Sequence, residues 1–191
     1  MIKLMIGEND TVYFYYYDVI DSNRVKMLMS LVGQVIGKEK CKSIYFLFAS
    51  RGGEVDAGIT LYNFFKSLPV EVIMHNIGVI NSIANVIFMA GVKRYAAPHT
   101  SFLFHGAQSQ LSGHFSIPQI NEILDSLMKD HDKIAGIIQE NSQITKKEIK
   151  KLFAQGETKD VHFALKKGVI HKIEIPQVPQ NARFITVNIN G

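Results

Sequence analysis

Cysteine is nearly absent from this chain of 191 residues, which contains a single one, Cys41. An intrachain disulfide is therefore excluded, and the composition suits a reducing compartment. The N-terminal stretch meets two acidic residues, Glu8 and Asp10, before any long apolar run, so no secretory signal peptide is predicted. We expect the protein to work in the cytoplasm.

Long apolar runs and one-sided charge are missing as well. The longest apolar region, 70–92, is interrupted by polar residues such as His75, Asn81 and Ser82, which excludes a lipid-facing helix of about 20 residues. The net charge is only +4, and the densest basic segment, 145–153, places its lysines opposite an apolar helix face. We therefore expect neither a membrane partner nor a nucleic-acid partner.

Internal repeats and low-complexity tracts are also lacking. What is present is a hydrophobic content of 47% in 191 residues, enough to bury one sizeable core. We predict a single domain over residues 1–191, with a C-terminal extension over 174–191. The sequence predicts no bound cofactor and no metal site.

Strand and helix patterns alternate along the chain. Segments rich in β-branched and aromatic residues, or nearly continuous in apolar ones, are typical of buried strands. Alternation with helices predicts βαβ units with right-handed crossovers, and hence an α/β fold with a largely parallel sheet. The predicted strands are 11–20, 43–50, 70–78, 94–98 and 101–107.

Apolar residues at helical spacing predict the intervening helices. One begins at Ser22 as its N-cap and ends at Gly37, and two more cover 55–67 and 82–91. A longer one covers 116–139 and would extend for about 33 Å at 1.5 Å per residue, too far to lie wholly on a small domain. Either this helix contacts a partner subunit, or it is an ordinary amphipathic helix of its own domain.

Two polar features stand where a predicted strand gives way to a helix. Ser82 is the first residue of the helix predicted at 82–91. At the start of a helix, unpaired N–H groups and the helix dipole favour an oxygen atom. Its hydroxyl is either a helix N-cap or a nucleophile with oxyanion donors beside it. Gly52 and Gly53 follow the strand at 43–50, and they form either a plain turn or a bare backbone that approaches a carbonyl oxygen.

Three segments in the order FASRGGEVDAGITLYNFF, GVINSIANVIFMAG and RYAAPHTSFLFHG resemble the ClpP family, the proteolytic subunit of the ATP-dependent Clp protease. The family's glycine pair corresponds to Gly52 and Gly53, its serine turn to 78–84, and its proline-to-histidine strand to 98–105. The long helix resembles the family's handle helix. The likeness implies a ClpP/crotonase-like spiral of βαβ units with that helix projecting.

The resemblance also implies a catalytic site. Ser82 is similar to the family's nucleophile, and His105 to the base that takes its proton. The backbone N–H groups of Gly53 and Ile83 correspond to the oxyanion hole. The chemistry is consistent, because a serine hydroxyl needs an adjacent base, and preorganised donors stabilise charge that develops only in the transition state.

The third catalytic group departs from the family's pattern. Gly156 falls at the position of the family's aspartate, so the next residue, Glu157, is predicted to orient the imidazole. Asp160 is the alternative, although it is also the predicted N-cap of a helix that follows. A loop carbonyl or a water molecule is a further option. Gln155 replaces the arginine of the family's contact between rings.

The resemblance predicts a cytoplasmic serine endopeptidase that cleaves polypeptides through an acyl-enzyme on Ser82. It implies a homo-oligomeric ring and, as a further partner, a Clp-type ATPase. Two alternatives remain at this point. One is a non-catalytic ClpP-like scaffold or mixed-ring subunit, and the other is a crotonase-type acyl-CoA enzyme, for which no carboxylates are placed to move a proton at a thioester.

Overall fold

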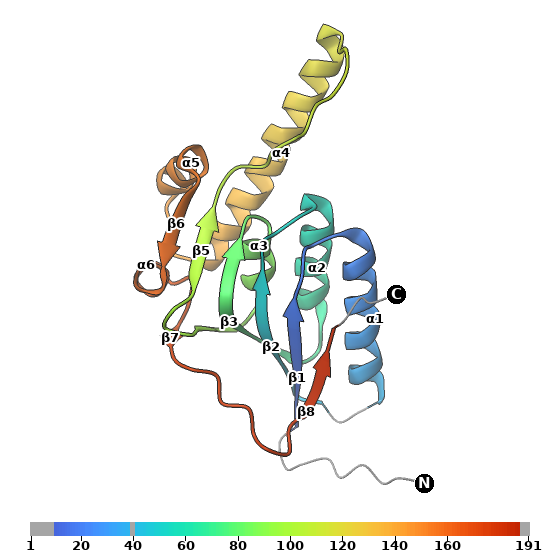
Figure 1. The fold of residues 1–191 in the computed structure, drawn as a ribbon, viewed down its shortest axis with the longest axis vertical. Helices are drawn as coiled ribbons and strands as arrows, with labels where there is room; N and C mark the ends of the chain where they lie inside the picture. The colour runs from blue at the N-terminus through green and yellow to red at the C-terminus, as the bar shows by residue number, and fades with distance from the viewer. Residues whose placement is uncertain (1–9, 39–40, 188–191) are drawn as a thin grey trace.

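The computed structural model of the protein describes residues 10–38 and 41–187. Glu8 and the last four residues of the expected C-terminal extension lie outside this range. Within the described residues, eight strands form one sheet in the order β6-β5-β3-β2-β1-β8, and off this path β4 pairs with β3 and β7 pairs with β4 (Figure 1). The strands are β1 Thr11–Tyr17, β2 Ser43–Ser50, β3 Glu71–Asn81, β4 Lys93–Ala96, β5 Ser101–Phe104, β6 Glu157–Asp160, β7 Lys172–Ile173 and β8 Arg183–Thr186.

Parallel pairing dominates the sheet, as the alternation of strands and helices predicts. β2 pairs in parallel with β1 on one side and β3 on the other, and nearly all of its side chains are buried. Aromatic pairs lock the register, with the Phe14 and Phe46 rings stacked at 4.9 Å between centroids. The exception is β6, which runs antiparallel to β5 and whose polar sequence ETKD gave no strand signal.

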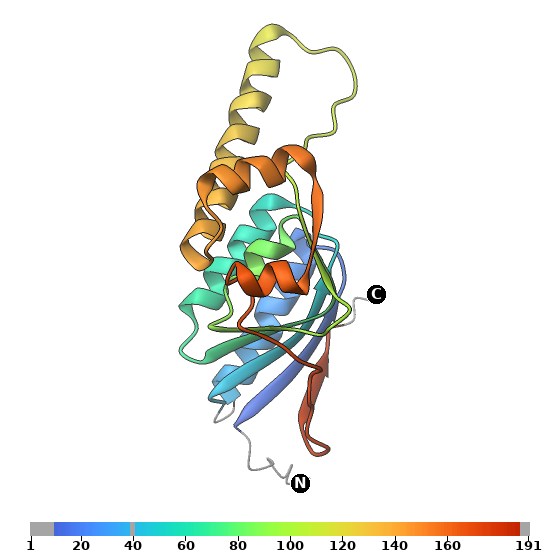
Figure 2. The same cartoon turned by 90° about the vertical axis from the view of Figure 1, so that its left-hand side faces the viewer.

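Helices cover one face of the sheet. Figure 2 shows α1, α2 and α3 on the same side of the strands, with the hydrophobic core between the two layers. A side chain at Gly58 of α2 would collide with Ile83 at the start of α3, so these two helices approach closely there. The helices are α1 Ser22–Lys38, α2 Val55–Ser67, α3 Ala84–Phe88, α4 Ile117–Asn141, α5 Lys146–Gln155 and α6 Val161–Lys166.

Two helix boundaries differ from the prediction. The N-cap of α1 is Asp21, whose carboxylate accepts the Arg24 N–H at 2.8 Å, while Ser22 is the first helical residue. The nearby carboxylate of Glu54 accepts both the N–H and the hydroxyl of Ser22. α3 is shorter than the predicted helix at 82–91, because its last N–H groups bond three residues back, as in a turn.

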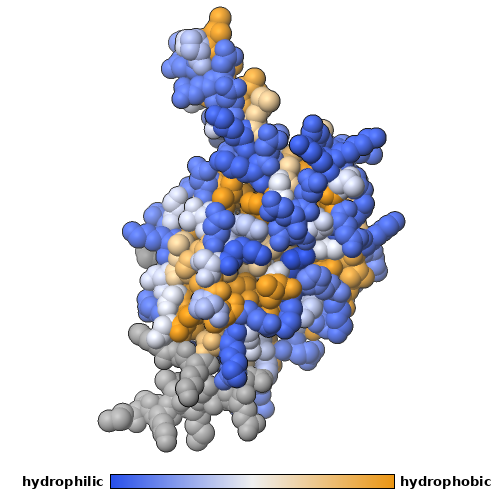
Figure 3. Space-filling view, turned by 180° about the vertical axis from the view of Figure 1, so that it is seen from behind, coloured by the Kyte–Doolittle hydropathy of each residue, from blue (hydrophilic) through white to orange (hydrophobic). Residues whose placement is uncertain are grey.

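The long helix α4 leaves the body of the domain, as its predicted length requires. Segment 106–116 runs out to the tip and α4 returns, so the two form an arm that projects from the sheet (Figures 1 and 2). Only Ile134 and Ile138, near its C-terminal end, are buried among the described residues of α4. Figure 3 shows hydrophobic atoms at the tip and along one side of the arm, among hydrophilic ones. The exposed apolar side chains of the arm are Leu111, Phe115, Ile117, Ile120, Leu124 and Met128.

A buried arginine joins the last elements to the sheet. Arg94 of β4 is 7% exposed, and its guanidinium donates to four backbone carbonyls, those of Gly91, Asn141, Gly168 and Val169. Burial lowers the pKa of Arg94. No helix in the described ranges is long and apolar enough to cross a membrane.

Candidate active site

Ser82 lies on a tight turn between β3 and α3. Its φ of 57° makes it the one non-glycine residue with a positive φ in the described part of the chain. L-residues avoid this region at a cost of about 1–2 kcal/mol, and such strain persists only where the surroundings hold the backbone in place. A serine on a sharp strand-to-helix turn has its hydroxyl presented outward, as in enzymes with a nucleophile elbow.

The Gly52–Gly53 turn lies directly against Ser82. A β-carbon at position 52 would lie 2.7 Å from the Ser82 Cβ and 2.8 Å from the Asn81 carbonyl oxygen. Gly52 also has a φ of 91°, which a side chain would strain. The two turns that the sequence singles out are therefore in contact, and glycine is what lets them meet.

Gly53 is oriented by its pairing with Ile20. The Ile20 N–H donates to the Gly52 carbonyl at 2.9 Å, and the Ile20 carbonyl accepts the Glu54 N–H at 2.8 Å. Gly53 lies between Gly52 and Glu54, the two residues that make these bonds. In a parallel bridge of this kind, the N–H of such a residue points away from the partner strand. Within the described residues, neither the Gly53 nor the Ile83 N–H donates a hydrogen bond. Both donors thus keep their hydrogen-bonding capacity in the described part of the chain.

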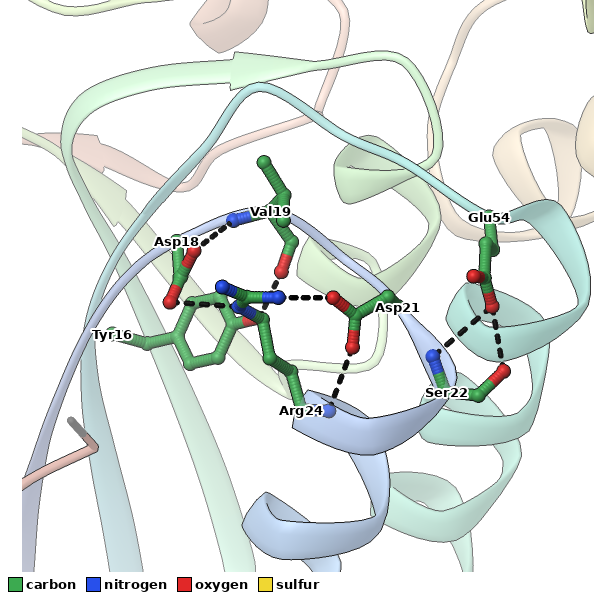
Figure 4. A network of polar contacts seen from close by, with 7 residues as sticks. All are labelled: Tyr16, Asp18, Val19, Asp21, Ser22, Arg24 and Glu54. Atoms are coloured by element: carbon green, nitrogen blue, oxygen red, sulfur yellow. Dashed lines mark hydrogen bonds and ion pairs between the residues drawn. The ribbon is translucent and has the colours of Figure 1, made fainter. Parts of the chain in front are cut away.

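A polar network holds the loop that carries Ile20 (Figure 4). The guanidinium of Arg24 forms ion pairs with the carboxylates of Asp18, at 2.8 Å, and Asp21. The buried Tyr16 hydroxyl donates to the Val19 carbonyl at 2.7 Å. These bonds fix the segment between β1 and α1, and through Ile20 they fix the backbone of the glycine turn.

His105 follows β5, and its tautomer is set by the backbone. The Nδ1 atom lies 2.7 Å from the Gly106 carbonyl oxygen. Because a carbonyl only accepts hydrogen bonds, the proton of a neutral imidazole sits on Nδ1, and Nε2 keeps the lone pair that a general base needs. The loop is supported from α4, where the His131 ring packs against Gly106 and its Nε2 lies 3.3 Å from the Ala107 carbonyl oxygen.

The backbone brings Ser82 to the strand that carries His105. The Ser82 N–H donates to the carbonyl of Leu103, two residues before the histidine, at 2.9 Å. In the described residues no hydrogen bond joins the Ser82 hydroxyl to the imidazole. Such bonds are often long without substrate and shorten in the reacting complex.

The two carboxylates predicted as third members are engaged elsewhere. Glu157 is exposed in β6 and pairs with Lys159 at 2.6 Å. Asp160 accepts the Phe163 N–H at 2.8 Å, so it caps α6 as the alternative interpretation expected. Within the described residues neither bonds His105. Gly156, just before β6, comes close to His105, since a β-carbon there would lie 3.9 Å from the His105 Cβ.

A cleft of about 510 Å³ opens beside the glycine turn. It lies between the start of α2, the loop after β5 and the α4 arm, and Glu54, Asp56, Leu127 and Asp130 are among its lining residues. The cleft adjoins the glycine turn through Glu54, and Ser82 is not among its lining residues. The described residues contain no group of three or more His, Cys, Asp or Glu side chains able to hold a metal ion.

Sequence reasoning did not assign three parts of this site to their residues. The role of Ile20 depends on a long-range backbone bridge, which a residue type does not reveal. The loop carbonyl that the sequence offered as an option could not be assigned to Gly106, because a main-chain atom leaves no signal in the residue type. Asn85, a buried amide in the first turn of α3, did carry a signal, since a polar residue within an apolar run needs a partner.

Comparison with known proteins bears on the same residues. A family model described as Clp protease matches residues 12–176, which includes the glycine turn, Ser82, His105 and both candidate carboxylates.

Three curated relatives carry related names. An ATP-dependent Clp protease proteolytic subunit from Streptococcus mutans is 28% identical over 155 residues, covering 77% of this chain and 78% of the relative. A protein of the same name from Bigelowiella natans is 29% identical over 104 residues, covering 53% of each chain. The proteolytic subunit 1 from Corynebacterium jeikeium is 29% identical over 111 residues. The chain thus spans 53% and 59% of the length of the last two.

Among solved structures, a mutant of ClpP1 from Listeria monocytogenes superposes with a TM-score of 0.73 at 19% sequence identity, covering 88% of this chain and 92% of the other. At this identity the match concerns the fold, and it confirms the predicted ClpP-like architecture.

Proposed function

Because the chain belongs to the Clp protease family, we propose that it is a serine peptidase in which Ser82 forms an acyl-enzyme with polypeptide substrates. The observation that carries the assignment is the contact between the two turns, which places the Ser82 side chain against Gly52 and next to the N–H groups of Gly53 and Ile83.

The reaction follows from the positions of the donors and the base. Ser82 Oγ attacks the peptide carbonyl carbon while His105 Nε2 takes the hydroxyl proton. The N–H groups of Gly53 and Ile83 hold the resulting oxyanion. The intermediate collapses, the peptide C–N bond breaks, and the amine leaves with the proton from His105. Water then attacks the ester with the same base, and the acid product is released.

The Gly106 carbonyl serves as the third group of the site. It accepts the Nδ1 proton of His105 and holds the imidazole in the tautomer that catalysis needs. Glu157 and Asp160, the carboxylates that the sequence put forward, have Lys159 and the N-terminus of α6 as partners. A neutral carbonyl stabilises the imidazolium less than a carboxylate does, so we expect a slower enzyme than one with a full triad.

Assembly is the second part of the proposal. We propose that the apolar side chains on the α4 arm form a subunit contact. Their exposure supports this, since the exposed fraction is 76% for Ile117 and 58% for Met128. We propose a homo-oligomeric ring in the cytoplasm, served by a Clp-type ATPase; the relatives' names, which call them proteolytic subunits of an ATP-dependent protease, support the ATPase partner.

The catalytic assignment is tested by intact-mass analysis after treatment with a fluorophosphonate. We expect a single adduct on Ser82, lost in Ser82→Ala and strongly slowed in His105→Ala. Ser126→Ala is the matched control, because Ser126 is a serine that lines the cleft beside the glycine turn, and its removal should leave labelling unchanged. If folded, assembled protein forms no adduct, the non-catalytic scaffold interpretation replaces this one.

The assembly is tested by sedimentation of Leu124→Glu, a charge placed on the arm. We expect smaller particles than for the wild type. Val178→Glu alters another exposed apolar residue, away from the arm, and should sediment as the wild type does. Equal sedimentation of the wild type and Leu124→Glu would remove the arm from the interface.

A further inference from the structure

Asn85 is a buried amide at the catalytic turn, in the first turn of α3. It is 1% exposed, and its Nδ2 group lies near three backbone carbonyl oxygens. The distances are 3.3 Å to Ile80, 3.1 Å to Ser82 and 2.9 Å to Leu103. These carbonyls belong to the end of β3, to the candidate nucleophile itself and to the strand that leads to His105.

The orientation of this amide is determined by its surroundings. If the group were flipped, Oδ1 would face three carbonyl oxygens, and lone pairs would oppose lone pairs. Nδ2 must therefore face the carbonyls. As a result, Oδ1 points the other way and has no hydrogen-bond partner in the described part of the chain.

Fold stability does not account for an asparagine here. A buried acceptor without a partner destabilises the folded state, whereas alanine would avoid that loss. Two of the three carbonyls also keep other donors, since the Ser82 carbonyl accepts the Asn85 N–H and the Leu103 carbonyl accepts the Ser82 N–H. The amide is instead the one side chain in the described residues that bonds both the Ser82 turn and β5.

We propose that Asn85 is a positioning residue that sets the distance between Ser82 Oγ and His105 Nε2. Ser82 has a strained φ, and its N–H makes the last backbone bond of the β3–β5 pairing, to the Leu103 carbonyl, next to the pair of Asn81 with Leu103. Asn85 adds a side-chain tie from beyond the strand and thereby limits rotation of the turn relative to the histidine. The role rests on the proposed peptidase function, but the tie itself is independent of it.

The test compares Asn85→Ala with Asn76→Ala. Asn76 is the matched control, because it is a fully buried amide in β3 that also donates to a β5 carbonyl, that of Ser101, at 3.1 Å. For Asn85→Ala we expect the rate of fluorophosphonate labelling at Ser82 and the kcat for peptides to fall about 10- to 100-fold, with KM unchanged. Its urea midpoint should equal or exceed that of the wild type.

Asn76→Ala should show the opposite behaviour. Its Oδ1 accepts the Gly78 N–H at 2.9 Å, so both ends of this amide have partners, and its removal should lower the urea midpoint. The labelling rate of the protein that remains folded should stay within about twofold of the wild type, because Asn76 makes no contact with the Ser82 turn.

Amide hydrogen exchange gives a readout that needs no activity. We expect faster exchange of the Ser82 N–H and of segment 80–86 in Asn85→Ala, without a change in the slowest, globally protected amides. Unchanged exchange in that segment would overturn the proposal. If the wild type is labelled at Ser82, an unchanged labelling rate in Asn85→Ala would also overturn the proposal. A wild type that fails to label, combined with faster exchange in the variant, would refute the peptidase function while keeping Asn85 as the tie between the turn and β5.

Discussion

A side chain at Gly156 would lie beside His105, with 3.9 Å between the two β-carbons. Gly156 ends α5 in the left-handed conformation, with a φ of 59°. The segment therefore already comes close to the imidazole, but it brings no carboxylate there.

Restoring that carboxylate should increase activity. Aspartate tolerates the left-handed region better than most residues, so Gly156→Asp should fold. If its carboxylate replaces the Gly106 carbonyl as the partner of Nδ1, we expect kcat to rise at least about tenfold. Peptide hydrolysis measures this, with Gly156→Ala as the control for strain without charge. Equal rates in all three proteins would show that the third group does not limit turnover.

The strained backbone of Ser82 predicts an order of stability among inactive variants. Ser82→Gly relieves the positive φ, whereas Ser82→Ala keeps it, so the glycine variant should be more stable by about 1 kcal/mol. Urea denaturation of both variants measures the difference. An alanine variant more stable than the glycine variant would mean that the turn is not held at that φ in solution.

Gly52→Ala should disrupt the contact between the two turns. Its β-carbon would overlap Ser82 and the Asn81 carbonyl, so we expect a loss of about 2 kcal/mol or more and of nearly all labelling at Ser82. Gly33→Ala is the matched control, since Gly33 is an exposed position in α1 with open space around it, where alanine should stabilise by about 0.5–1 kcal/mol. Similar labelling by both variants would contradict the contact.

Acid should weaken α5 through Glu148. Its carboxylate bonds the Lys167 ammonium and the N-cap residue Thr145, and these bonds lower the pKa of Glu148 from 4.5 to about 2. A depressed carboxyl pKa contributes stability above its unfolded value, and that contribution is lost as the pH falls from 4.5 toward 2. The free energy of unfolding should therefore fall more steeply over this range in the wild type than in Glu148→Gln. Glu140→Gln, at an exposed position of α4, should follow the wild type.

Much of the fold could be predicted because its signals are local. The bounds of α2, Val55–Ser67, match the prediction at both ends, and β2 was recognised from one continuous apolar run. The strand β6 was missed because its stability comes from pairing with β5, not from its own four residues. The start of α1 was misplaced by one residue because Asp21 and Ser22 are both good N-cap residues, and Asp21 is the one that accepts the Arg24 N–H.

The candidate site also has parts that could be predicted from the sequence and parts that could not. Ser82, His105 and the glycine turn carry recognisable residue types at a recognisable spacing, so the sequence alone could name them. The surroundings of His105 could not be predicted, because they depend on how β6 returns to β5 and on a main-chain carbonyl. Glu157 has suitable chemistry, and in the structure its carboxylate pairs with Lys159, which the alternation of β6 places on the same side of the strand.

The pairing of β5 with β6 also orders events in time as the chain is made. Ile20, the glycine turn and Ser82 all precede His105, whereas the support of the histidine loop comes from α4 and β6, more than fifty residues later in the case of β6. At ordinary synthesis rates, roughly several seconds pass between the synthesis of Ser82 and the synthesis of the segments that support the His105 loop. A nascent chain would thus carry an exposed serine but no competent base, and could not cut itself or its neighbours before release.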